Sequence, residues 1–318
     1  MLQKKLIFTL AVALLATLVH PAADAEQRRV DETRVAKSDG FVEISVVRGN
    51  LDIEGWGRDE ISVEGRLDEQ TREFVFDTDG NGAVIAVRLP NNTNDWCCNE
   101  GSDLRIRVPE NSHISVTTVS TEVDVSNISG GIELGGVSGD VTLVDVHNRV
   151  NVTSVSGEIQ LRNADGKIRL KSVSGEVVAE DVRGEGSFKS VSGEVRIRNY
   201  DGELVTESVS GDIDLVDVVY SELRGSTVSG DVEVNGRMKE NGLLEFDSVS
   251  GSLRAKFKGE VNARFDLQTR SGSVRNRLSE HEATKSRYVR DETLRMTLGD
   301  GSGEVMLETR SGDVIVTH

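Results

Sequence analysis

The sequence predicts an all-β fold: a β-solenoid of stacked ~18-residue, two-strand coils with a strand-rich N-terminal region and a C-terminal cap. Ser-Gly-acid triplets recur between Ser138 and Asp231, in four steps of 18 residues followed by one of 19. A valine precedes every Ser-Gly pair, from Val137 to Val228. Self-similarity at a fixed period of this length is typical of stacked structural units rather than of one closed domain.

Each unit divides into two halves in which polar and apolar residues alternate, as in Ser156 to Val173. Strict alternation indicates a strand with one buried face, and the unit lacks the apolar spacing of a helix. Stacking the units aligns two inward apolar columns: Val141, Ile159, Val177, Val195, Ile213 and Val232, and beside them Leu143, Leu161, Ala179, Ile197, Leu215 and Val234. We therefore expect two sheets facing each other across a thin core.

The corners of the predicted coils carry their own signals. Glycine at a corner supplies the positive φ that a tight turn needs. Asparagine and aspartate can bond their own turn, and stacked side-chain amides can bond along the axis. Such residues align in one column: Asn127, Asp145, Asn163, Asp181, Asn199 and Asp217.

Residues 1–25 have the pattern of a signal peptide. Lys4 and Lys5 precede an apolar run over residues 6–19, and Ala23-Asp24-Ala25 offers a cleavage site. The run is short for a membrane span, so we expect export to the periplasm or cell envelope, with no transmembrane segment after signal cleavage. An uncleaved N-terminal anchor is the alternative.

The rest of the chain divides into three parts. Residues 26–112 are strand-rich and less regular, and we expect them to cap one end of the solenoid, because exposed sheet edges must be covered. Residues 113–278 form the regular repeat. Residues 279–318 hold a charged insertion and C-terminal strands. The insertion, Ser279 to Thr293, breaks the pattern and predicts either a short helix or an exposed loop.

The acidic residues of the triplets form a second candidate column. Stacked carboxylates about 5 Å apart repel one another, and Ca²⁺ would relieve the repulsion. The alternative, which we favour, is a solvated acidic edge partly neutralised by Arg162, Arg196 and Arg198. The metal candidates are Asp140, Glu158, Glu176, Glu194, Asp212 and Asp231.

Two shorter motifs also suggest sites. Residues 77–82, Asp-Thr-Asp-Gly-Asn-Gly, match the first half of a Ca²⁺ loop, but Arg88 stands where the loop needs glutamate, so a hairpin turn is the better interpretation. Cys97 and Cys98 are the only cysteines. In an oxidising compartment we favour an oxidised structural turn, a disulfide between the two, with intermolecular bonds or a weak soft-metal pair as alternatives.

No catalytic constellation emerges. The histidines of the mature chain, His113, His147, His281 and His318, do not pair at metal-ligand spacing, and no nucleophile elbow, phosphate loop or dinucleotide fingerprint occurs. A net charge of −17 argues against nucleic acid as a partner. A modest basic strip could meet an anionic glycan or a lipid headgroup, although a mixed-charge surface explains it as well: Arg149, Lys167, Arg169, Lys171 and Lys189.

The Val-Ser-Gly-acid coils resemble the bacterial "putative adhesin" domain family, as do the stretch from Leu51 to Val63 and the strand from Ile106 to Pro109. That resemblance implies an exported or envelope-associated β-solenoid of unknown function, with no catalytic residues to carry over, and a link to envelope stress in some relatives.

We expect a non-enzymatic envelope protein that offers a binding or scaffold surface to an envelope protein or an anionic glycan, without a cofactor. Self-stacking of the solenoid ends is a further possibility of the fold. The alternatives are a β-helix enzyme acting on polysaccharide, which needs a groove and two positioned carboxylates, and a Ca²⁺-stabilised surface module.

Overall fold

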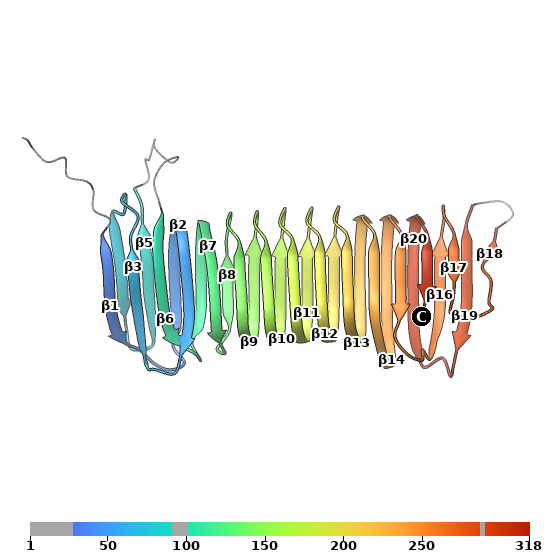
Figure 1. The fold of residues 1–318 in the computed structure, drawn as a ribbon, viewed down its shortest axis with the longest axis horizontal. Coiled ribbons are helices and arrows are strands. Elements are labelled where there is room, and N and C mark those ends of the chain that lie inside the picture. Colours follow the sequence, from blue (N-terminus) through green and yellow to red (C-terminus); the bar gives the residue numbers. More distant parts are fainter. Residues whose placement is uncertain (1–27, 91–100, 287–289) are drawn as a thin grey trace, which may run out of the picture.

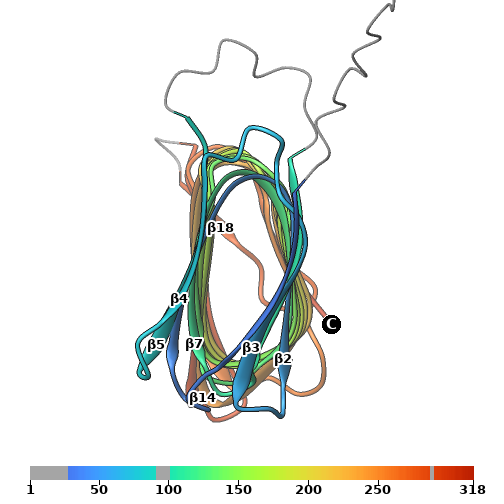
Figure 2. The ribbon, with the colours of Figure 1, turned by 90° about the vertical axis from the view of Figure 1, so that its left-hand side faces the viewer.

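The structure, a computed structural model, describes residues 28–90, 101–286 and 290–318. Within these ranges every regular element is a strand, and the strands belong to one continuous sheet. Figure 1 shows the sheet wound into a long stack, and Figure 2, along the stack, shows a narrow oval with two flattened sides. The predicted all-β solenoid is confirmed. The described residues hold no helix that could span a membrane.

The regular coils lie in the middle of the stack, and neighbours pair in parallel with Ile159 opposite Val177 and Val195 opposite Ile213. Their strands are β9 (Val141–Ser154), β10 (Ile159–Ser172), β11 (Val177–Ser190), β12 (Val195–Ser208) and β13 (Ile213–Ser229). The two strands predicted for each coil are the two halves of one bent strand, because interstrand pairing continues almost unbroken around the corner. We call the sheet made by the first halves the first wall and the sheet made by the second halves the second wall.

The corner inside each strand depends on the predicted column of asparagine and aspartate. Asn163, Asp181 and Asn199 have φ of 54°, 56° and 53°. This left-handed conformation is one that short polar side chains tolerate better than other non-glycine residues. The side chains also bond along the axis, since Asn199 Nδ2 donates to Asp181 Oδ1 at 3.1 Å. The predicted corner position of this column and its bonding along the axis are confirmed.

The core is a thin double layer between the walls. Every residue of the two predicted inward columns is buried, and Val150, Ile168 and Leu204 face them from the second wall. The core thickness is kept constant by compensation between positions: Phe188 fills the space left by Gly186 and meets Tyr200 edge-on, with ring centroids 6.2 Å apart. Burial of the whole apolar side of each strand stabilises the stack.

The turn between coils is held by a buried serine that sequence reasoning overlooked. Ser172 Oγ accepts a hydrogen bond from the Gly175 amide at 2.9 Å, and Ser190 and Gly193 repeat the contact at 2.9 Å. The turn amides also bond along the stack, as the Ser192 N–H donates to the Val173 carbonyl at 2.9 Å. The turns are therefore part of the coil-to-coil hydrogen-bond ladder.

Glycine is needed in some of these turns for a reason other than the predicted positive φ. Positive φ applies at Gly139 and Gly157, at 112° and 122°, but Gly175 and Gly193 lie outside the left-handed region. A Cβ at Gly193 would lie 2.0 Å from the Gly175 carbonyl oxygen. Glycine is required there because successive turns touch backbone to backbone.

The N-terminal end is closed by antiparallel strands. The elements are β1 (Arg29–Val35), β2 (Phe41–Trp56), β3 (Glu60–Arg66), β4 (Glu73–Thr78), β5 (Gly82–Arg88), β6 (Ser102–Pro109), β7 (His113–Ile128) and β8 (Ile132–Gly135). β2 pairs in parallel with β7 on one side and with β5 and β6 on the other. β1 and β3 then add to β6, and β4 adds to β5, all antiparallel. These strands occupy the end of the stack where the sequence predicts a cap.

The C-terminal coils are not stacked in sequence order. The elements are β14 (Val232–Ser250), β15 (Leu253–Phe257), β16 (Ala263–Thr269), β17 (Val274–Asn276), β18 (Thr284–Lys285), β19 (Glu292–Leu298), β20 (Gly303–Ser311) and β21 (Val314–Thr317). β20 lies between β14 and β16, and β21 lies between β15 and β17, all in parallel. The coil formed by the last strands of the chain, β20 and β21, thus lies inside the coil formed by β16 and β17, which is nearer the end of the stack.

The charged insertion contains no helix in its described residues. β18 lies there and pairs antiparallel with β19, which itself runs antiparallel to β16 and closes that wall. The helix alternative for Ser279 to Thr293 is therefore wrong. Polar residues dominate this stretch, and Ala283 is the one hydrophobic residue among its described positions that packs partly against the core, so a helix would have little apolar surface to bury.

The contact between turns yields a first prediction. Gly193→Ala should lower the free energy of unfolding by about 2–4 kcal/mol, because its Cβ would clash with backbone that cannot move without breaking the ladder. Ser192→Ala, at the exposed neighbouring position, is the matched control and should change stability by less than about 0.5 kcal/mol. Urea denaturation of both variants measures the difference, and equal stabilities would contradict the proposed packing.

Candidate binding surface

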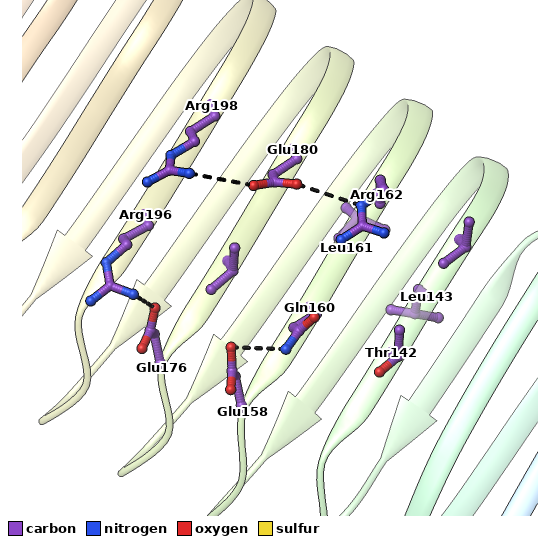
Figure 3. Close-up of a pocket in the computed structure, with 12 residues that line it drawn as sticks. Thr142, Leu143, Glu158, Gln160, Leu161, Arg162, Glu176, Glu180, Arg196 and Arg198 are labelled. Carbon is purple, nitrogen blue, oxygen red and sulfur yellow. Dashed lines mark hydrogen bonds and ion pairs between the residues drawn. The ribbon is translucent and has the colours of Figure 1, made fainter.

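The first wall carries a shallow depression across β9 to β12, drawn in Figure 3. Its volume is about 200 Å³. Arg162 and Arg198 approach Glu180 from two neighbouring strands, at 3.5 and 3.8 Å. Arg196 pairs with Glu176 and, at 2.7 Å, with Glu194. The charges in this depression thus largely neutralise one another.

The predicted neutralisation of the acidic column is therefore correct for only one arginine. Arg196 reaches Glu176 and Glu194, whereas Arg162 and Arg198 pair with Glu180, which is not part of the column. The reason is geometric. Arg196 directly follows a turn and its strand starts beside the acids, while Arg162 and Arg198 lie two residues farther along the wall.

The aspartates of the acidic column continue the ladder between coils. Asp140 Oδ1 accepts from the Glu158 amide at 2.8 Å, and Asp212 Oδ1 accepts from the Asp231 amide at 2.7 Å. Asp231 Oδ1 accepts from the Ser252 amide at 2.8 Å, and this bond, together with Arg254, lowers the pKa of Asp231. The column thus has a structural role at its aspartates.

The glutamates of the same column differ in environment. Burial raises the pKa of Glu176 above its usual range, with Arg196 opposing the rise and Glu158 and Glu194 adding to it. In the described ranges no three His, Cys, Asp or Glu side chains gather in a way that could hold a metal ion. Binding of Ca²⁺ by this column, the less favoured alternative, stays a hypothesis.

Residues 77–82 form the turn of the β4–β5 hairpin, as expected. Asp79 Oδ1 accepts hydrogen bonds from the Asn81 amide at 3.0 Å and from the Gly82 amide at 2.8 Å. These two donors lower the pKa of Asp79. The aspartate therefore caps its own turn, which accounts for the motif without a cation.

The remaining sequence candidates are dispersed or lie outside the described residues. His113 stacks on Phe41 with ring centroids 5.6 Å apart, His147 pairs with Asp165, and His281 accepts or donates a hydrogen bond at Ser279. Cys97 and Cys98, and the predicted signal peptide at 1–25, lie outside the described residues. The structure brings no two of the described histidines together.

The second wall presents the basic strip. Lys167 pairs with Glu185 and Lys189 pairs with Glu207, both at 2.7 Å. Arg149, Arg169 and Lys171 are exposed and have no carboxylate within ion-pair distance in the described part of the chain. Parallel pairing places Arg149 beside Lys167. The strip is thus a group of cations of which three form no ion pair in that part of the chain, although Arg169 lies near Glu185 and helps to lower the pKa of that carboxyl.

Sequence reasoning missed two features of the turn edge. One is the column of buried serines that includes Ser172 and Ser190. The other is the exposure of the valines before each Ser-Gly pair, for example 37% at Val173 and 38% at Val191. The signal was available in both cases, because a serine stands two residues before Ser156, Ser174, Ser192 and Ser210, and counting outward from the buried Ser172 places Val173 outside.

The coil architecture and its turn signature identify the family. The family described as "Toastrack DUF4097" matches residues 41–317, so the chain belongs to it. The match confirms the family resemblance drawn from the Ser-Gly-acid coils. Among curated proteins, no match to the sequence was found.

The comparison with solved structures gives matches of low sequence identity and low TM-score. One is named a "putative cell adhesion protein" from Clostridium sporogenes, with 10% identity, a TM-score of 0.27, and coverage of 91% of this chain and 99% of that one. Two come from Parabacteroides distasonis, both with 12% identity. The "putative lipid binding protein" has a TM-score of 0.37, and the match covers 91% of this chain and 96% of that one. The "putative adhesin" has a TM-score of 0.38, and the match covers 92% of this chain and 98% of that one. Likeness this weak says nothing about the function of this chain.

The hydrogen bond to Asp231 yields a second prediction. A carboxylate whose folded pKa lies below its unfolded value, about 3.9, contributes stability above that value and loses it as the pH falls through the folded pKa. Asp231→Asn keeps an acceptor for Ser252 but removes the charge. It should destabilise the protein by about 1 kcal/mol or less at pH 7, since the side chain is well exposed.

Thermal unfolding of both proteins between pH 7 and pH 3 tests this linkage. The difference in melting temperature between wild type and Asp231→Asn should become smaller as the pH falls below about 4. Arg254→Gln is the matched control, because it removes the ion pair and leaves the amide donor in place, and it should reduce the pH dependence only in part. A difference between wild type and Asp231→Asn that is constant over the whole range would contradict the assignment.

Proposed function

We propose that this protein is a non-enzymatic, exported protein of the cell envelope whose β-solenoid serves as a binding surface for an anionic glycan. The leader pattern of residues 1–25 supports export. The uniform coils and short turns support a role in display, because they give the protein long, flat walls on which charged side chains repeat at each coil.

The observation that carries the proposal is the unpaired cationic group on the second wall. Six lysines and arginines of β9 to β13 form ion pairs, whereas Arg149, Arg169 and Lys171 on the second wall, and Arg183 at the corner, form none among the described residues. Cations kept together in a chain with a net charge of −17 are suited to a negatively charged partner. Successive coils repeat about every 4.8 Å along a flat wall, which fits a linear polymer with repeated anionic groups.

A polysaccharide-cleaving enzyme fits these features less well. Such an enzyme needs a groove and an acid–base pair of carboxylates on either side of the scissile bond. The depression on the first wall is shallow. Of its three carboxylates, Glu176 and Glu180 pair with arginines, and Glu158 accepts a hydrogen bond from Gln160. We therefore assign no catalytic residue. A Ca²⁺-stabilised module remains the third hypothesis, which a chelator would test through the melting temperature.

Binding to dextran sulfate, a defined anionic glycan, tests the proposal. The triple variant Arg149→Glu, Arg169→Glu, Lys171→Glu should bind about tenfold more weakly than wild type, because it replaces three attractive contacts by repulsive ones. The remaining affinity should also depend less on salt. Neutral dextran of equal length should not bind to either protein.

The matched control reverses three other exposed cations, Arg72→Glu, Arg237→Glu and Lys256→Glu, and so has the same net charge. This variant should bind as wild type does. Equal losses in both variants would mean that only net charge matters and would contradict a site on the second wall. In cells, a photo-crosslinker at Asn151, on the second wall, should capture envelope polysaccharide more than one at Gln160, on the first. Capture of a protein at Asn151 instead would replace the glycan by a protein partner.

A further inference from the structure

Exposed valines form a continuous row along the turn edge of the solenoid. Each occupies the position before a Ser-Gly pair, at the end of a strand or in the turn that follows it. Their exposed fractions lie between 37% and 49%: Val137, Val155, Val173, Val191, Val209, Val228 and Val249. With coils about 4.8 Å apart, the row is about 30 Å long. Single exposed valines are ordinary, whereas a contiguous apolar row indicates an interface.

The fold itself does not require valine at this position. The turn is held by the buried serine, the glycine and the amide ladder, none of which involves the valine side chain. Two coils of the same stack carry arginine there instead. Arg310 and Arg270 precede Ser311 and Ser271, Ser311 pairs with Ser250, and the Gly312 amide donates to the Ser271 carbonyl at 3.0 Å. A polar residue is compatible with the turn, and the two arginines mark where the apolar row ends.

The distance between successive valines determines which kind of structure can pack along the whole row. Side chains on one face of a strand repeat about every 6.8 Å, and coils of a parallel stack about every 4.8 Å. Only another parallel β-stack can therefore place one apolar side chain opposite each valine along the whole row. We propose that the valine row is an interface between two copies of this chain, packed edge to edge with their solenoid axes parallel.

The charges beside the row determine the relative direction of the two copies. Lys171 and Lys189 lie on the second-wall side of the row, and the acidic column that includes Glu176 and Glu194 lies on the first-wall side. A two-fold axis parallel to the solenoid sets the lysine side of each copy against the acidic side of the other. With reversed axes, the acidic column would face its own copy, and like charges directly opposite are destabilising.

The size of the row sets the strength of the contact. An apolar patch of this kind measures a few hundred Å², so the dimer lies at the small end of specific interfaces, which begin at about 1,200 Å² of total buried surface. The negative net charge of each copy also opposes association, less so at physiological salt. We therefore expect a weak, reversible dimer. Self-association does not depend on the proposed glycan, so each proposal can fail without the other.

Sedimentation velocity of the purified protein tests the interface. The wild-type sedimentation coefficient should rise with concentration, and Val191→Asp with Val209→Asp should abolish the rise, because the carboxylates would be buried against apolar side chains. The matched control, Val35→Asp with Val84→Asp, changes two exposed valines outside the row and should dimerise like wild type. A monomeric wild type up to about 200 μM, or a row variant that still dimerises, would overturn the proposal.

Disulfide trapping tests the direction. In a background with Cys97→Ser and Cys98→Ser, Val155→Cys and Val228→Cys are introduced separately. Parallel axes bring each position against itself, so both variants should form covalent dimers under mild oxidation. Antiparallel axes allow self-contact at one level of the row at most. Trapping of neither or only one variant would overturn the parallel arrangement, and circular dichroism of each variant verifies that it is folded.

Discussion

Direct backbone contact between successive turns is the constraint on which the rest of the structure depends. The carbonyl oxygen of Gly175 occupies the place where a Cβ of Gly193 would be, and the Ser192 amide bonds to the Val173 carbonyl at 2.9 Å. Coils can approach this closely because the turns from Gly139 to Gly251 keep the same length and a glycine at the same point. The constant period, the straight walls and the alignment of identical side chains along the stack all follow from that contact.

Much of this architecture could be predicted from the sequence because it repeats. The spacing of the Ser-Gly pairs revealed the coil, alternation separated buried from exposed positions, and the Asn and Asp column located the corner at residues such as Asn163. The position of β20 and β21 could not be predicted in the same way. Thr309 to Gly312 repeats the turn of Thr269 to Gly272, which shows that both belong to the stack but does not encode their order. In a parallel stack any coil of suitable length can pair with any other, so tertiary packing decides. The ion pairs of Arg162 and Arg198 depend likewise on side-chain conformations that periodicity does not specify.

Because both ends of the stack are covered by strands, we expect binding to take place on the sides of the molecule. Antiparallel strands β1, β3 and β4 cover one end, and β18 and β19 cover one wall of the other, which limits the strand edges open to further pairing. Three lateral surfaces differ in chemistry: a first wall whose charges are mutually paired, a second wall on which Arg149, Arg169 and Lys171 form no ion pair with the described residues, and an apolar turn edge. A dimer formed through the turn edge would leave both second walls accessible, so self-association and glycan binding are compatible and would together give a bivalent surface.

Hydrogen exchange followed by mass spectrometry measures most directly whether the turns are structural parts of the stack. The amides of Ser156, Ser174, Ser192 and Ser210 each donate to the carbonyl of the valine in the preceding turn, at 2.8 to 2.9 Å. If turn-to-turn contact holds the coils together, these amides should exchange as slowly as those of the flanking strands, because both open only when the stack separates. Fast exchange at the turns, with slow exchange confined to the strands, would contradict this and would mean that the walls alone hold the solenoid together.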